Sequence, residues 1–92
     1  MNVTVHYFGQ IRQLTGRDHE PVACGESEGV AKLLIDLADQ YGDDFRKLIL
    51  DEAGSVRSSL LILVNGQPID RQVHSVLTDG DEVTLLPPIA GG

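Results

Sequence analysis

The chain has 92 residues, of which 41% are hydrophobic and 23% charged, a size and composition that suit one small soluble domain. Lys and Arg number 7 and Asp and Glu number 14, so the formal net charge of -7 argues against nucleic acid or a membrane surface as partner and favours a basic protein surface. A single cysteine, Cys24, and the absence of an apolar run of ~20 residues or a leader pattern predict a cytoplasmic protein.

The first predicted element is a strand in the opening segment NVTVHYF, where side chains alternate between two faces. Such a period of two is typical of a strand whose one face is covered by a core. The two faces consist of Val3, Val5 and Tyr7 on one side and of Thr4, His6 and Phe8 on the other.

A turn and a second strand are predicted next. Gly9 and Gly16 bracket a stretch that turns the chain, in which Ile11 and Leu14 have the spacing of one helical turn. The following segment, DHEPVACGE, predicts a weak strand, and Pro21 places this strand at a sheet edge because proline cannot donate a backbone hydrogen bond.

Two helices are predicted in the middle of the chain. In SEGVAKLLIDLADQYG the apolar residues follow one helix face, Ser27 can cap the first turn, and Gly42 can take the left-handed position after the last turn. These apolar residues are Val30, Leu33, Leu34, Leu37, Ala38 and Tyr41. A short second helix in DDFRKLIL would point Phe45, Leu48 and Ile49 inward.

Two further strands follow. Leu60–Val64 is an apolar strand that ends at the turn signal Asn65-Gly66. The turn at Asp79-Gly80 precedes a last strand at Glu82–Leu86. Two strands, a long helix and two or more later strands indicate an α+β domain.

An exposed apolar patch is expected on this domain. A strand as apolar as Leu60–Val64 is normally covered on both faces, but one long helix covers only one face of the sheet. Phe8, Leu86 and either Leu61 or Leu63 would then face outward together, and an exposed apolar patch usually marks a binding surface. In the alternative interpretation, these residues cap the sheet edges beneath loops.

Nothing in the sequence indicates a self-contained active site. His6, His19 and His74 lack partners at metal-ligand spacing, so no metal site is predicted. Gly9 and Gly16 fit neither the dinucleotide-binding spacing nor the P-loop. We therefore expect no bound cofactor and no catalysis by the chain alone.

The ending LLPPIAGG has an unusual composition for a terminus. Pro87 and Pro88 favour a stiff, extended arm that leaves the sheet, and its six residues can reach roughly 20 Å. Gly91 and Gly92 have no Cβ and could enter a channel too narrow for other residues. The alternative is a simply frayed end. The predicted division is a domain at residues 1–86 and an extended tail at residues 87–92.

Three segments, YFGQIRQLTG, VNGQPI and LTDGDEVTLLPPIAGG, resemble the MoaD/ThiS family of ubiquitin-like sulfur carriers. The resemblance covers nearly the whole chain, and the PPIAGG ending is more similar to the molybdopterin branch than to the thiamine branch. It implies a β-grasp fold, with a mixed sheet and one main helix packed on one face.

The resemblance also implies a sulfur carrier for molybdenum cofactor biosynthesis. An adenylyltransferase resembling ubiquitin-activating enzyme would use ATP to adenylate the Gly92 carboxylate, which a persulfide would convert to a thiocarboxylate. The carrier would then dock on the large subunit of molybdopterin synthase and donate sulfur to a pterin precursor. The alternatives are a ubiquitin-like protein modifier and a sulfur carrier for thiamine or cysteine synthesis.

By the same resemblance, Gly92 would carry the sulfur and Gly91 would allow its passage. Phe8, Pro68 and Leu86 match apolar docking positions of the family, and Arg12 matches a basic contact position, although it could equally be a solvated helix residue. With the two prolines of the arm, the predicted partner-binding residues are Phe8, Arg12, Pro68, Leu86, Pro87 and Pro88.

Overall fold

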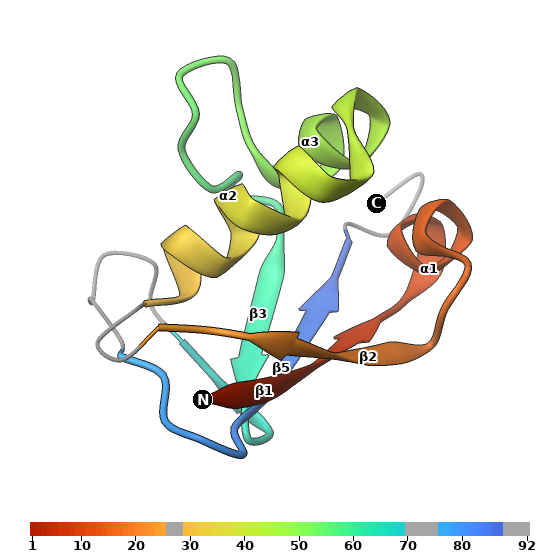
Figure 1. Cartoon of the computed structure of the whole chain (residues 1–92). Helices are drawn as coiled ribbons and strands as arrows, with labels where there is room; N and C mark the ends of the chain where they lie inside the picture. Colours follow the sequence, from red (N-terminus) through yellow and green to blue (C-terminus); the bar gives the residue numbers. More distant parts are fainter. Residues whose placement is uncertain (26–28, 70–75, 88–92) are drawn as a thin grey trace.

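A computed structural model of the chain describes residues 1–25, 29–69 and 76–87. Three helices lie on one side of a five-stranded sheet, as Figure 1 shows. In chain order the elements are β1 (Asn2–Tyr7), α1 (Gly9–Thr15), β2 (His19–Ala23), α2 (Val30–Tyr41), α3 (Asp43–Ile49), β3 (Leu61–Val64), β4 (Gln67–Pro68) and β5 (Glu82–Leu86).

The sheet is mixed and has the order β2-β1-β5-β3-β4. Strands β1 and β5 are parallel neighbours, whereas the β1–β2, β3–β5 and β3–β4 pairs are antiparallel. The edge position predicted from Pro21 is confirmed, because β2 is an outermost strand. The last strand, β5, lies in the middle of the sheet, so β1 and β5 end side by side.

The core lies between the sheet and the helices, and the predicted alternation is confirmed. Val3, Val5 and Tyr7 are buried on β1, and Val83 and Leu85 are fully buried on β5. Helix α2 covers them with the apolar face predicted from its spacing: Val30, Leu33, Leu34, Leu37 and Ala38 are all buried. The mixed sheet with its main helix on one face therefore has the predicted architecture.

The helix boundaries differ in part from the expectation. The N-cap of α2 is Gly29, without a side-chain hydrogen bond, and Ser27, which we expected to cap this helix, lies outside the described residues. Gly42 has the expected positive φ of 95°, but its ψ of -169° leads directly into α3 instead of continuing in a left-handed helical conformation. The predicted turn after β1 is the helix α1, which buries Ile11 and leaves Leu14 exposed.

A buried carboxylate links β2 to the core. Glu20 is only 7% exposed, and it accepts a hydrogen bond of 2.6 Å from the Tyr7 hydroxyl and another from the Tyr41 hydroxyl. Both hydroxyls bond to Glu20 Oε2, and Arg17 Nη1 lies 3.7 Å from the other carboxylate oxygen, Glu20 Oε1. Burial, and then the hydrogen bonds to Glu20, raise the pKa of both tyrosines. The phenols therefore stay protonated and hold β1, β2 and α2 together.

A second carboxylate joins two turns beside β5. Asp81 accepts hydrogen bonds from the Thr78 backbone N–H at 2.8 Å, from the Thr78 hydroxyl at 3.0 Å and from Asn65 Nδ2 at 2.9 Å. Asn65 Oδ1 accepts from the Glu82 backbone N–H at 2.9 Å. The turn between β3 and β4 is thus attached to the turn before β5. These bonds, led by the one from the Thr78 backbone, lower the pKa of Asp81.

Replacement of Asp81 should give a pH-dependent loss of stability. Asp81→Asn is expected to lower the free energy of unfolding by about 1 kcal/mol at pH 7, because one acceptor oxygen and its charge are lost at a solvent-screened site. The folded-state pKa lies below the ordinary value of 3.8, so the stabilisation is present above that value and is lost as pH falls through the folded pKa. Urea unfolding at pH 7 and at pH 3 measures this difference.

Glu52→Gln, which neutralises an exposed carboxylate in the loop after α3, is the control for that measurement. The difference between Asp81→Asn and the unmodified chain should shrink on acidification, while the control should follow the unmodified chain. A difference that is independent of pH would contradict the proposed role of the Asp81 charge.

Candidate functional site

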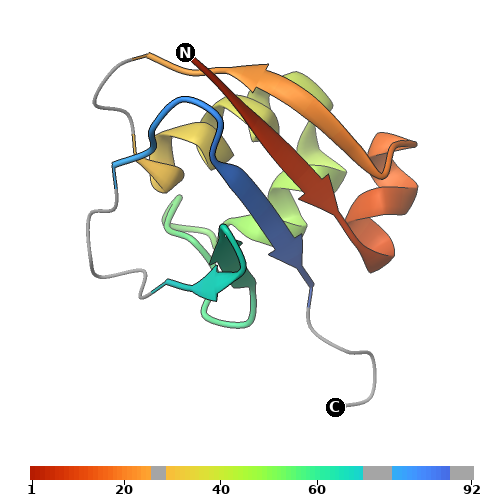
Figure 2. The ribbon, with the colours of Figure 1, turned by 90° about the horizontal axis from the view of Figure 1, so that it is seen from below.

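The face of the sheet opposite the helices is open among the described residues. Figure 2 shows this side, with the helices behind the strands. Cross-strand partners share a face of a sheet, and the registers pair His6 with Thr84, Leu63 with both Thr84 and Pro68, and Leu61 with Leu86. We call this side the outer face. Its side chains include Thr4, His6, Leu61, Leu63, Pro68, Thr84 and Leu86, and Phe8 continues it beyond the end of β1.

An apolar patch occupies the end of the outer face at which β1 and β5 finish. It consists of Phe8, Leu61, Leu63, Leu86 and Pro68. Phe8 and Leu61 are each 46% exposed, so the expectation of an exposed patch is confirmed and the described loops do not cover it. The sequence left the choice between Leu61 and Leu63 open, and both lie on this face, since they pair with Leu86 and Thr84.

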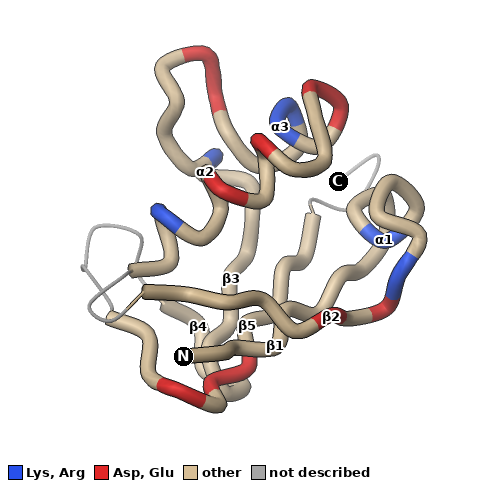
Figure 3. Tube along the Cα trace, viewed as in Figure 1, with Lys and Arg blue, Asp and Glu red and all other residues tan. Residues whose placement is uncertain are grey.

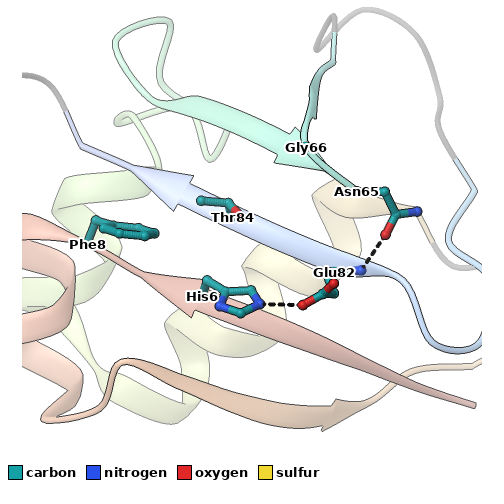
Figure 4. A pocket seen from close by; sticks show the side chains of 6 residues that line it. All are labelled: His6, Phe8, Asn65, Gly66, Glu82 and Thr84. Carbon is teal, nitrogen blue, oxygen red and sulfur yellow. Dashed lines mark hydrogen bonds and ion pairs between the residues drawn. The ribbon is translucent and has the colours of Figure 1, made fainter.

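Next to Phe8 the outer face has a shallow hollow of about 260 Å³ (Figure 4). His6 Nε2 lies 2.9 Å from Glu82 Oε1 at its floor, and the ring of His6 is 5.6 Å from that of His19. Asn65 and Gly66, which have φ values of 52° and 81°, form the turn at its rim. The lining residues are His6, Phe8, Asn65, Gly66, Glu82 and Thr84.

The sequence alone does not predict this hollow, because there His6 is only a histidine without metal-ligand spacing. The signal that could have found it is the alternation that places His6 on the face of Phe8. In the described part of the chain, no three or more His, Cys, Asp and Glu side chains are grouped so that they could hold a metal ion. The arrangement suits recognition of a protein surface, with an apolar centre and a polar margin.

Arg12, the predicted basic contact, lies on α1 and not in the apolar patch. Its Nε is 2.5 Å from Asp18 Oδ1, and both side chains are mostly exposed. Arg12 lines a hollow of about 420 Å³ together with Gly9, Gln13 and Gly16. An exposed ion pair of this kind contributes little to stability, so the guanidinium can exchange partners at low cost.

Of the predicted tail, the structure describes Pro87. This residue is half-buried and follows β5 directly. Pro88, Gly91 and Gly92 lie outside the described residues, so their predicted roles stay predictions, as does the division between domain and tail at Leu86. None of the helices in the described ranges combines the length and the apolar character that crossing a membrane requires.

Comparison with known proteins identifies the family to which this chain belongs. The model of the ThiS family matches residues 5–92. The chain belongs to the ThiS family. It is a sulfur carrier of the ThiS/MoaD type, as the resemblance in its sequence implied.

Three relatives of this ThiS-family chain have names that point to different roles. The molybdopterin synthase sulfur carrier subunit of Chlamydomonas reinhardtii is 27% identical over 92 residues, and the alignment covers all of both chains. Small archaeal modifier protein 3 of Haloferax volcanii is 29% identical over 97 residues, also with full coverage. The sulfur carrier protein CysO of Mycobacterium tuberculosis is 32% identical over 95 residues, again with full coverage.

The fold of the ThiS-family chain is the ubiquitin-like β-grasp. Its structure is similar to the crystal structure of SAMP1 from Haloferax volcanii, with a TM-score of 0.85, 19% identity and full coverage of both chains. The β-grasp implied by the sequence resemblance is therefore confirmed. At this identity the likeness concerns the fold alone.

Proposed function

We propose that the chain carries sulfur for molybdenum cofactor biosynthesis, as the non-catalytic, sulfur-donating subunit of molybdopterin synthase. The observation that carries the proposal is the position of the apolar patch at the end of the sheet where β5 releases the tail. Leu86 belongs to the patch and Pro87 to the tail, and they are neighbours in the chain. A partner that covers the patch therefore receives the tail next to its own surface.

The chemistry of the tail suits sulfur donation. A carboxylate is a poor electrophile, so Gly92 would first be activated as an acyl-adenylate, with ATP supplied to the activating enzyme. The outer sulfur of a persulfide on a sulfur-donor protein would then displace AMP and form an acyl disulfide. A thiol of that donor would attack the inner sulfur, which releases the thiocarboxylate and leaves a disulfide on the donor. Its sulfur is ionised at neutral pH and polarisable, the properties that make a thiolate a better nucleophile than a thiol. Gly91 would let the end of the chain enter a narrow active site.

The proposed partners are the large subunit of molybdopterin synthase and an adenylyltransferase resembling ubiquitin-activating enzyme, all in the cytoplasm. Figure 3 shows acidic residues on α2, on α3 and on the loops. The segments LILV of β3 and QP of β4 carry no charge, and Glu82 is an acidic residue in the hollow beside Phe8. With a net charge of -7, the chain would be steered toward a partner with a basic margin around an apolar centre.

Two other functions are supported by specific relatives. The 29% identity to small archaeal modifier protein 3 supports a protein modifier, joined through Gly92 to lysines of other proteins. The 32% identity to CysO supports sulfur delivery in cysteine synthesis, and thiamine synthesis belongs to the same class of function. All three functions use the same tail and differ in the acceptor.

The test is intact-mass measurement of the chain after incubation with the adenylyltransferase, ATP and a sulfur donor. We expect the mass change of one oxygen replaced by one sulfur, and its reversal when the large synthase subunit and the pterin precursor are added. No exchange of oxygen for sulfur would contradict the carrier function. Exchange without transfer to the pterin would favour cysteine or thiamine synthesis, and adducts on lysines would favour the modifier.

A further inference from the structure

We propose that Gly9 is a positioning residue for the tail, because its missing side chain leaves the space in which the ring of Pro87 rests. This contact would fix the direction in which the chain leaves β5. The inference rests on the proposed function, since a fixed direction matters only if a partner receives the tail. It adds a residue from the other end of the chain to the site.

The topology brings the two residues together. Strands β1 and β5 are parallel, and Tyr7 is level with Leu85 in their register. Two residues after Tyr7 and two residues after Leu85, just beyond the ends of β1 and β5, the chain reaches Gly9 and Pro87. An ideal Cβ built on Gly9 would lie 2.9 Å from Pro87 Cγ and 3.7 Å from its Cδ. The shorter distance is less than any side chain tolerates, so the prolyl ring occupies the volume that a larger residue 9 would need.

On the Gly9 side of this contact, the corner between β1 and α1 is held in place. Phe8 is the N-cap of α1, and its carbonyl oxygen accepts hydrogen bonds from the backbone N–H groups of Ile11 at 3.1 Å and Arg12 at 3.3 Å. Ile11 is fully buried in the core. The corner between β1 and α1 is therefore held by backbone hydrogen bonds and by the core, and a Cβ on residue 9 would displace Pro87 and not the corner.

On the Pro87 side of this contact, a displacement of the ring also displaces the backbone of the tail. The pyrrolidine ring is closed onto the backbone nitrogen and fixes φ, so its Cγ cannot swing away as the end of a flexible side chain would. Moving the ring moves the backbone that leads to residues 88–92. A misplacement of about 1 Å at a reacting group can lower a reaction rate by roughly 100-fold.

The backbone of Gly9 also has a positive φ of 55°, which most residues with a side chain adopt only with strain. The chain offers a matched control for this second effect. Gly16, at the other end of α1, has a φ of 71°, and a Cβ built there meets nothing within 4 Å. Gly16→Ala introduces backbone strain alone, whereas Gly9→Ala introduces strain and the contact with Pro87.

The test is the pattern of backbone amide signals of the tail in NMR spectra of the isolated full chain, which needs no partner protein. Gly9→Ala is expected to shift the signals of residues 88–92, and Gly16→Ala is expected to leave them in place. In a Pro87→Ala background, where the ring is gone, Gly9→Ala should add no further shift. Gly9→Asn is the second variant, because asparagine tolerates positive φ but carries the same Cβ.

A kinetic readout separates positioning from a merely structural role. For adenylation by the activating enzyme, Gly9→Asn should lower kcat about tenfold or more and leave KM unchanged, because the apolar patch that docks is intact. Equal tail signals for the Gly9 and Gly16 variants, or an effect of Gly9→Ala that persists without Pro87, would overturn the inference. If Gly9→Ala shifts the tail signals but the unmodified chain accepts no sulfur, the role of Gly9 in directing the tail is upheld and the proposed function is rejected.

Discussion

A chain that lacks Gly91 and Gly92 is expected to unfold at the same temperature as the full chain and to accept no sulfur at all. The core and the sheet end before these residues, since β5 ends at Leu86. The shortened chain still has a terminal carboxylate, on Ala90, but this group lies two residues back along the arm and has a Cβ beside it. Intact mass after treatment with the activating enzyme, ATP and a sulfur donor measures the loss.

Gly92→Ala is the matched variant for this deletion. It keeps the length of the arm and the carboxylate and adds only one methyl group, so it tests whether the receiving channel requires the absence of a Cβ. We expect it to accept sulfur at a rate reduced by about 10-fold or more, as for a group misplaced by a fraction of an ångström. Loss of folding in the deletion, or sulfur loading at the rate of the full chain, would contradict the role given to the tail.

The second large effect is expected at Phe8. Phe8→Ala should raise the Kd for the large synthase subunit by about 30-fold or more, because truncating an aromatic residue at the centre of an interface costs roughly 2 kcal/mol or more. The domain should remain folded, because Phe8 is 46% exposed and its side chain makes no capping hydrogen bond to α1. Titration calorimetry gives the Kd, and thermal unfolding gives the stability of the same variant.

Ile35→Ala provides the control for Phe8. Ile35 is 39% exposed on α2, on the opposite side of the sheet from the apolar patch. The variant Ile35→Ala should remove a comparable area of exposed apolar surface from the protein without changing the Kd for the large synthase subunit. Leu61→Ala, a change within the apolar patch, should weaken binding in the same direction as Phe8→Ala. Equal binding by the Phe8 and Ile35 variants would show that the partner uses another surface.

Much of the fold could be predicted from the sequence, because local spacing decides which side chains face the core. Alternation in β1 and the spacing in α2 identified the buried residues Val3, Val5, Leu33 and Leu37. The turn signal at Asn65 was equally local, and its positive φ of 52° is the conformation that the turn requires. The same alternation predicted the apolar patch, since residues that do not face the core face the other side of the sheet.

The rest of the site depends on contacts between distant residues, which no local pattern reveals. In the sequence, Gly9 resembles an ordinary turn glycine, and only the structure places Pro87 next to it. Glu20 has the sequence context of an exposed edge strand, yet two tyrosine hydroxyls bury it. For Arg12 the resemblance implied a contact position but no partner within the chain, and the structure supplies Asp18.

The central place of β5 has a consequence for the order in which the protein becomes active during its synthesis. His6 and Glu82 are 76 positions apart and yet adjacent, so β1 has no partner on that side until the ribosome has released β5. Until then the antiparallel β1–β2 pair and the β3–β4 hairpin cannot form one sheet. The apolar patch, which combines residues of both pairs with Leu86 of β5, does not exist before that point. A nascent chain that lacks β5 would therefore not present the apolar patch to the proposed partner, so the chain could enter the proposed sulfur pathway only after its last strand has joined the sheet.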